Sequence, residues 1–360
     1  MSFIYSSSSQ TNNSVLRQLE VPLKMLIEAE SDYQRTKVGA LSALFNIEKS
    51  NRFGEVIQTR NEFSMFRAAM EGEPAETDTL ADTTMKFIEH IPFMKEFVIT
   101  KQMLDDSATG LAIDAKRRAQ AFVRAYYLTM NKLAEKAIAN GKEESIEFNN
   151  ATIDLKTGDD VPLFSKTHLF GTPFKGFDVQ SNFFGINRYA DGNKGLTLAD
   201  VENAITKGAA RLRNMKDENG EILGYTADTI IIPGNMPLLE KYVKQILGSP
   251  IDPQGNNNSI NVLYGNWNVI VLPGWQYQLA SNEEEQTFPI ILMSSEANRN
   301  LCGNMFFNRI PLSIKNWEDA HTRNWIWNGY CRFGIGFGTY KHIALIESYS
   351  ASANGSQTQI

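Results

Sequence analysis

The feature that most constrains the fold is an apolar stripe between Ser107 and Gly141. Eight apolar residues follow one another at steps of four, four, three, four, four, three and four: Leu111, Ala115, Ala119, Phe122, Tyr126, Met130, Leu133 and Ala137. This spacing places all of them on one face of a helix. Asp106 or Ser107 can cap its start and Asn140-Gly141 can end it. The sequence predicts a helix of about 30 residues, about 45 Å long, that packs along one side.

Shorter elements alternate after this helix. "SIEFNNATIDL" and "PLFSKTHLF" are strand-like and are separated by the turn "KTGDD". A helix starts at "TLADVENAITKGAARLRNM", where Thr197 and Asp200 form a capping box. A buried strand, "TIII", is followed by a helix over Pro237–Leu247, and "NVLYGNWNVIVLPGW" and "FPIILMSS" supply further strands. The interleaving predicts an α/β or α+β middle domain of roughly 110 residues, followed by a β-rich, glycine-kinked block at 322–348.

The segment Arg52–Asp82 has a different character. Apolar residues there stand beside three arginines, and "EGEPAETDTLAD" is acidic without one basic residue. Such a segment has little core of its own, so we interpret it as a projecting hairpin or loop used in binding or assembly. A plain surface loop is the alternative. The candidate contact residues are Arg52, Arg60, Phe63, Met65, Phe66 and Arg67.

The two ends are rich in small polar residues. Residues 1–14 and the stretch after Glu347 offer little to bury, so each is expected to be mobile alone or to order only against a neighbouring subunit. Between the N-terminal tail and Lys49, apolar residues recur at helical spacing, interrupted by Pro22.

Bulk composition excludes several classes of protein. The longest apolar runs are too short to span a bilayer, and the N-terminus lacks the layout of a signal peptide. Two cysteines, Cys302 and Cys331, fit a reducing compartment better than a disulfide framework. The net charge of −6 argues against a surface devoted to nucleic acid, yet suits a wall that must not adhere to one.

Catalytic and metal-binding motifs are missing from the sequence. It has no Gly-rich phosphate loop ending in Gly-Lys-Ser/Thr, no G-x-S-x-G and no H-E-x-x-H. The four histidines, His90, His168, His321 and His342, are far apart in sequence, which predicts structural roles and no metal site. We therefore expect no enzymatic activity and no cofactor.

Two glycine-containing stretches are candidate ligand sites. "FGIGFGTY" precedes a strand-like segment and not a helix, so its glycines are interpreted as strand positions of close backbone approach. "TIIIPGNMPLLEKYVKQIL" has the outline of a nucleotide-binding unit, but its turn holds one glycine, Gly234, and no lysine. Pro237 at the first helical turn explains the corner by itself.

Taken in order, these elements resemble the major capsid proteins of tailed bacteriophages with the Hong Kong 97-type fold, and most closely the Mu-like major head subunits. The resemblance rests on "FVITKQMLDDSATGLAIDAKRRAQAFVRAYYLTMNKLAEKAIANG", on "PLFSKTHLF" and on the passage from "LTLADVENAI" to "YVKQILGS". "GNWNVIVLPGW" and "NGYCRFGIGFGTYKHIALI" resemble the strands that follow. The match runs from about Ile91 to Glu347 and is one of pattern. It departs at Thr226-Ala227-Asp228, where such proteins often carry a proline.

The resemblance implies an α+β fold with six parts. These are an N-terminal arm (1–50), an extended loop (51–90), a peripheral domain (91–195) with a spine helix (107–140), an axial domain (196–310), closing strands of the peripheral domain (311–349) and a flexible tail (350–360). It implies a structural protein that assembles with itself, as hexamers and pentamers, into an icosahedral shell around double-stranded DNA without sequence-specific binding. The expected location is the virion, after assembly in the cytoplasm of the host bacterium.

The resemblance also implies partners and a path of maturation. A separate scaffolding protein, a portal and a decoration protein are expected, because the arm is too short to hold the scaffolding segment of some relatives. Between Lys49 and Lys86 the chain has no lysine. We therefore expect no covalent cross-link through the extended loop of the kind that some relatives form.

Three alternatives stay open at this point. An encapsulin-like compartment shell would close around protein cargo, and a tail-tube or sheath subunit would form open filaments. An α/β enzyme would use the unit Tyr225–Leu247 as a ligand site.

Overall fold

The computed structural model describes residues 4–7, 25–34, 39–60, 63, 65–66, 68, 70–74, 77, 82–100, 102, 110–172, 176–187, 195–251, 260–280 and 286–349. The chain divides into two compact units. Unit 1 comprises residues 1–55, 88–134 and 306–335, and unit 2 comprises residues 56–87, 135–305 and 336–360.

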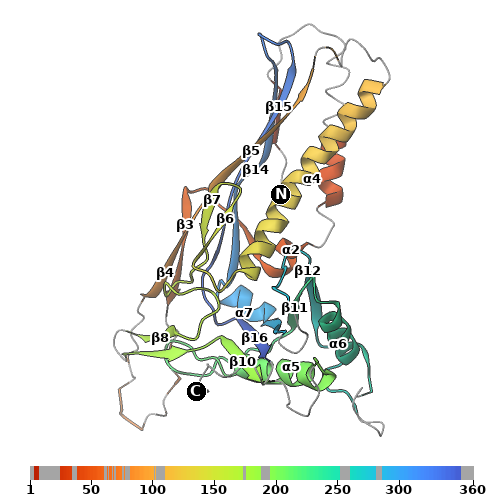
Figure 1. Ribbon diagram of the computed structural model, residues 1–360. Helices are drawn as coiled ribbons and strands as arrows, with labels where there is room; N and C mark the ends of the chain where they lie inside the picture. The colour runs from red at the N-terminus through yellow and green to blue at the C-terminus, as the bar shows by residue number, and fades with distance from the viewer. Residues whose placement is uncertain are drawn as a thin grey trace. The chain divides into compact units, whose positions relative to one another are not determined.

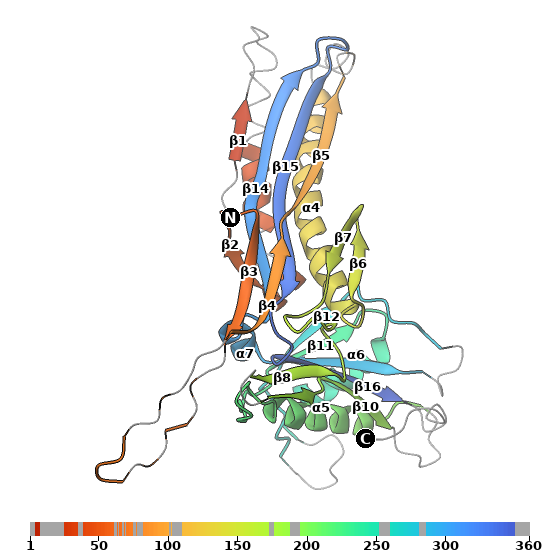
Figure 2. The same cartoon turned by 90° about the vertical axis from the view of Figure 1, so that its left-hand side faces the viewer.

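Unit 1 is built on a five-stranded sheet. Its strand order is β1-β14-β15-β5, and β2 also pairs with β14. The strands are β1 (Ile4–Ser7), β2 (Asn46–Lys49), β5 (Ile91–Ile99), β14 (Asn304–Glu318) and β15 (Trp325–Phe337). β5 and β15 are antiparallel, with Ile91 opposite Phe333 and Ile99 opposite Trp325. Figure 2 shows these strands side by side, with α4 (Gly110–Ala139) behind them.

The predicted long helix is present as α4. The predicted stripe residues from Ala119 to Ala137 are buried, and the side chains of Leu111 and Ala115 lie outside the described residues, as do Asp106 and Ser107. In unit 1 the Phe122 ring lies 5.3 Å from that of Phe97, which stacks on Trp327. A Cβ at Gly329 would lie 2.3 Å from Phe122, so this strand residue must be glycine for the helix to pack closely. The apolar stripe thus fixes how α4 meets the sheet.

Two shorter helical segments belong to unit 1. Residues 25–34 are helical and bind α4 through Ser31 to Tyr127, at 2.8 Å between hydroxyls, and through Glu30 to Arg124, at 2.8 Å. The second helix is α2 (Ala40–Leu44). The helical spacing predicted up to Lys49 was wrong at its end, because 46–49 form β2. Pairing with β14 overrides the local pattern there.

Unit 2 is organised around a second five-stranded sheet, of order β10-β16-β13-β11-β12. β10 (Phe183–Asn187) is parallel to β16 (Ile343–Tyr349), and β11 (Thr229–Pro233) is parallel to β12 (Asn268–Leu272). β13 (Phe288–Met293) is antiparallel to both β16 and β11. Figure 1 shows α5 (Leu198–Arg213) and α6 (Pro237–Gly248) near this sheet, and α7 (Ser295–Asn300) follows β13.

The core of unit 2 joins the sheet to α5 and α6. Alternate sheet residues, such as Ile230, Leu292 and Ile346, share one buried cluster with residues of both helices. Both helices therefore pack on the same face of the sheet. A Cβ at Gly208 on α5 would lie 2.6 Å from Ile346 and 2.7 Å from Leu292, so a glycine is needed for this approach. The predicted capping box is confirmed, with the Asp200 amide donating to Thr197 Oγ1.

Three two-stranded sheets complete unit 2: β3 (Gly54–Arg60) with β4 (Asp82–Glu89), β6 (Ser145–Phe148) with β7 (Ala151–Asp154), and β8 (His168–Thr172) with β9 (Gly176–Gln180). The interpretation of "SIEFNNATIDL" as one strand-like piece was wrong. Asn149 and Asn150 have φ values of 48° and 64°, and so form the tight turn of the hairpin β6–β7. In "PLFSKTHLF" the strand begins only at His168.

Candidate inter-subunit surface and polar hub

The turn after β11 shows no phosphate-binding character. The Gly234 amide already donates to the Leu272 carbonyl at 2.9 Å, so it is not available to an anion. A Cβ at this position would lie 2.7 Å from Pro273 Cα, which explains the glycine by backbone packing. Pro237 begins α6 as expected. Backbone packing thus explains Gly234, and helix initiation explains Pro237.

One face of the hairpin β3–β4 packs against other segments of unit 2. Ile57 is buried, and Lys86 Nζ reaches Asp154 Oδ2 of β7 at 2.5 Å with only 6% of its side chain exposed. Thr84 lies against Gly158, where a Cβ would meet Thr84 Oγ1 at 2.8 Å. Because side chains alternate along a strand, the residues between these must point the other way.

The opposite face of this hairpin is apolar and exposed. Val56 on β3 and Met85 and Phe87 on β4 are 55%, 65% and 52% exposed. We call these three residues the outer face. Between the two strands, Phe63, Met65, Phe66 and Met70 are also exposed. Apolar side chains gathered on one segment in this way mark a surface that a partner covers.

The predicted contact residues lie in the following places. Arg52, in unit 1, is exposed, and its carbonyl accepts a hydrogen bond from His90 Nδ1 at 3.1 Å. Phe63, Met65 and Phe66 are exposed between β3 and β4. Arg60 ends β3 but its side chain lies outside the described residues, as does Arg67. Their contact with a neighbour remains a prediction. The outer face was missed, although the alternation in "GEVIQ" and "TMKFIE" could have indicated it.

The second notable site is buried. The segment Gly338–Ile343 connects β15 to β16, and polar contacts from several parts of unit 2 converge on it; we call it the polar hub. The Gly338 amide donates to the Gly303 carbonyl at 2.8 Å. The Ser294 amide donates to the His342 carbonyl at 2.9 Å. Sequence reasoning missed the hub, because its contacts come from segments far apart in the chain.

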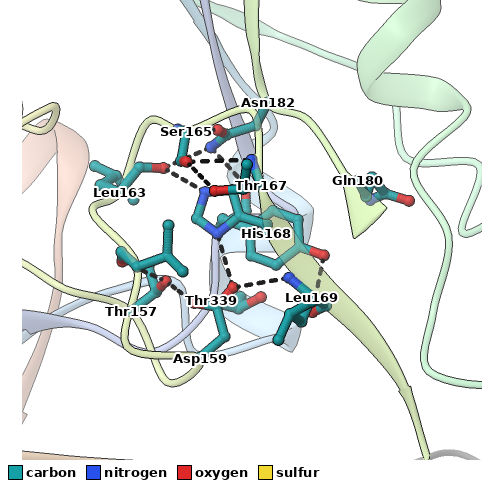
Figure 3. Close-up of polar contacts among 12 residues, drawn as sticks. Thr157, Asp159, Leu163, Ser165, Thr167, His168, Leu169, Gln180, Asn182 and Thr339 are labelled. Atoms are coloured by element: carbon teal, nitrogen blue, oxygen red, sulfur yellow. Dashed lines mark hydrogen bonds and ion pairs between the residues drawn. The ribbon is translucent and has the colours of Figure 1, made fainter. Parts of the chain in front are cut away.

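A buried histidine packs on the hub (Figure 3). The His168 ring stacks on the Tyr340 ring with centroids 3.8 Å apart. His168 Nδ1 lies 2.9 Å from Asp159 Oδ2, and Nε2 lies 3.2 Å from the Leu163 carbonyl. Since both nitrogens face acceptors, the ring donates from both only in its protonated form. His168 and Asp159 thus form a buried hydrogen-bonded pair.

The Asp159 carboxylate is held in its charged form. Burial raises its pKa, but the hydrogen bond and charge of His168 and the hydrogen bonds from Thr157 and the Leu169 amide outweigh this. The pKa of Asp159 therefore lies below its ordinary value. Asn182 completes the cluster, donating from Nδ2 to the Leu163 carbonyl at 2.6 Å and to the Ile343 carbonyl at 3.3 Å.

The other hub side chains are also paired inside unit 2. Lys341 Nζ lies 2.5 Å from Glu218 Oε1, with 4% and 11% of the two side chains exposed. His342 Nε2 lies 2.8 Å from Asn304 Oδ1. These contacts join the hub to other segments of unit 2. Three of the four histidines, His90, His168 and His342, are fully buried.

Among the described residues, no group of three or more His, Cys, Asp or Glu side chains is arranged to hold a metal ion. No helix within the described ranges is long and apolar enough to cross a membrane.

Comparison with solved structures identifies the fold. The capsid structure of the cyanophage P-SCSP1u is similar with a TM-score of 0.50 and 10% identity, covering 88% of this chain and 89% of the other. The capsid of Myoviridae phage XM1 gives 0.44 and 11%, covering 84% and 89%. A virus-like particle from Pyrococcus furiosus gives 0.42 and 10%, covering 91% and 98%. The likeness to the cyanophage capsid confirms the α+β fold of Hong Kong 97 type.

Comparison of sequences identifies the family. No curated protein matches this chain significantly. The family described as "Phage capsid protein" matches residues 95–346, well over half of the chain. This protein is therefore a member of the phage capsid protein family.

Proposed function

We propose that this protein is the major head subunit of a tailed bacteriophage, and that it assembles with itself, as hexamers and pentamers, into an icosahedral shell around double-stranded DNA. Membership of the phage capsid family carries this proposal. The exposed apolar outer face supports it, because a chain that stays monomeric would leave Val56, Met85 and Phe87 in water.

In this shell the outer face and the residues between β3 and β4 contact a neighbouring subunit. Phe63, Met65 and Phe66 become buried, and Arg52, Arg60 and Arg67 pair with acidic residues of the neighbour. The contact is heterologous, since this hairpin meets a different surface of the next subunit. Heterologous contacts generate rings when the rotation closes, as a hexamer or pentamer requires.

The finer expectations belong to the same proposal. Within the tailed phages we place the protein nearest to the Mu-like head subunits, on the sequence pattern alone. It works with a separate scaffolding protein, a portal and a decoration protein, and assembles in the cytoplasm of the host. As a wall around DNA it needs neither catalysis nor a cofactor, and its net charge of −6 limits adhesion to the polymer inside.

A matched pair of substitutions tests the proposed contact. Val56 on the outer face and Val179 on β9 are each 55% exposed in the single chain. We expect Val56→Asp to abolish assembly, because it places a charge in the interface, while the subunit keeps the melting temperature of the unassembled wild type. Val179→Asp should assemble normally. Assembly is measured by sedimentation of the purified proteins through a sucrose gradient.

Three outcomes can be told apart in this experiment. If Val56→Asp formed shells in the same yield as the wild type, the proposed contact would be contradicted. A matching loss of assembly in both variants would show that the effect is not specific to the outer face. Failure of the wild type to form any large particle, alone or with its scaffolding protein, would contradict the proposed function itself.

A further inference from the structure

The polar hub contains a histidine whose surroundings suit only the neutral ring. His342 is fully buried at the start of β16. Its Nε2 lies 2.8 Å from Asn304 Oδ1, while Nδ1 has no hydrogen-bonding partner among the described residues. Gly303 lies against the same edge of the ring, where a Cβ would be 2.5 Å from Nδ1. Within the described part of the chain, a second proton on Nδ1 would therefore find no carboxylate to pair with, and only the Thr339 backbone favours it.

The neighbours of the ring fix which nitrogen carries the proton. Asn304 Nδ2 points to Met293 Sδ at 3.6 Å, so its Oδ1 is the atom left to face the ring. An amide oxygen can only accept, and hence Nε2 donates. The backbone N–H of Asn304 donates to Asn298 Oδ1 at 2.7 Å, which fixes the main chain beside the ring.

The charged groups around the hub do not compensate a cation at this position. Lys341 is paired with Glu218, and Asp159 with His168 against Tyr340. On α7 and the connection after it, the titratable residues are Glu296 and Arg299, both exposed, and Cys302. On β16 the carboxylate of Glu347 binds Lys142 and the Tyr277 hydroxyl. None of the hydrogen bonds found for the ring of His342 joins it to a carboxylate.

The direction of the pKa shift of His342 agrees with this geometry. Burial lowers the pKa of His342 to about 3 and outweighs the Thr339 backbone, which raises it. The ordinary value for histidine is about 6.5. The folded state therefore binds fewer protons than an opened state between these two values, and acid favours opening.

We propose that the polar hub is an acid-sensitive latch: protonation of His342 expels its ring from the pocket beside Asn304 and opens the segment Gly338–Ile343. The proton comes from solvent and adds to Nδ1, giving an imidazolium that water can solvate only outside the pocket. Opening releases the hydrogen bonds from the Ser294 amide to His342 and from the Gly338 amide to Gly303. This property goes beyond the proposed function and does not depend on it.

The size of the effect follows from proton linkage. Below about pH 6.5, the ratio of open to closed latch rises about tenfold for each pH unit, until the closed form itself titrates. At pH 6.5 the open form is already half protonated, so between pH 6.5 and pH 4.5 the latch should open about 50-fold more often.

Amide hydrogen exchange of the full-length protein tests the latch. Exchange is measured from pH 6.5 to pH 4.5 and corrected for the intrinsic rate, at the amides of Ser294, Gly338 and Ile343. In the wild type, protection at these amides should fall about 50-fold, while amides of β11 in the same unit keep theirs. In His342→Gln, which keeps a donor but does not titrate, protection should not depend on pH.

A second variant keeps the test informative if His342→Gln fails to fold. Asn304→Asp places a carboxylate at hydrogen-bonding distance from the ring, so the imidazolium gains a partner and the latch should stay closed at pH 4.5. Unchanged protection of the wild type down to pH 4.5 would overturn the proposal. The same acid loss in the wild type, in Asn304→Asp and in any folded His342→Gln would also overturn it.

Discussion

At the scale of single residues, the buried polar groups of unit 2 respond to pH in definite directions. Asp159 and His168 form a hydrogen-bonded pair with 4% and 0% of their side chains exposed. The Asp159 carboxylate also accepts from Thr157 and from the Leu169 amide, so its removal deprives several buried donors of a charged acceptor.

Asp159→Asn should therefore destabilise the protein by about 3 kcal/mol at pH 7. The pKa of Asp159 is lowered in the folded state. Its contribution is thus present above the unfolded value of about 3.9 and disappears as pH falls through the folded value. Urea unfolding of both proteins at pH 7 and at pH 2.5 measures this. A difference between them that grows in acid would contradict the assignment.

At the scale of elements, the start of α5 is specified by local hydrogen bonds. Thr197 Oγ1 accepts from the Asp200 amide, and Asp200 accepts from the Thr197 amide at 3.0 Å. The helix then packs on the sheet through residues such as Val201, Ile205 and Leu212, all buried. Capping and packing thus agree on where the helix begins.

Thr197→Ala should lower the free energy of unfolding by about 1 kcal/mol, because one amide at the helix start loses its acceptor. Thr197→Ser keeps the oxygen and serves as the control. Thermal unfolding followed by circular dichroism makes the comparison. Equal stability of the Ala and Ser variants would show that the box adds nothing here.

The elements that the sequence predicted well are those whose signal is local. The stripe that ends at Ala137 predicted α4, Thr197 and Asp200 predicted the start of α5, and Pro237 predicted that of α6. The strand interpretation of "FGIGFG" was correct for Gly334 and Gly336, which lie in β15, and wrong for Gly338, which follows the end of that strand. A Cβ at Gly334 would lie 2.6 Å from the Glu89 carbonyl oxygen in unit 1.

The elements that the sequence missed depend on partners distant in the chain. Asn46–Lys49 forms a strand because β14 offers an edge, and no periodicity within four residues could reveal this. The polar hub joins Asp159, Glu218 and Asn304 to one short segment, a convergence that needs coordinates. The turn Asn149-Asn150 was a local signal, and it was overlooked.

At the scale of the whole molecule, the chain is a subunit with apolar side chains exposed on its surface. Each unit has its own sheet and its own buried core, yet the outer face of the hairpin β3–β4 leaves Val56, Met85 and Phe87 in water. The predicted contact residues Phe63, Met65 and Phe66 add to the exposed apolar surface. A closed assembly of many copies buries such surfaces without leaving an exposed end.

Electron microscopy of the purified protein tests this account most directly. It predicts closed icosahedral particles built of hexamers and pentamers, and particles recovered from infected cells should contain double-stranded DNA. Closed particles filled with protein cargo would support a compartment shell, and open filaments would support a tail subunit. Either result, or a protein that remains monomeric at every concentration, would contradict the central claim.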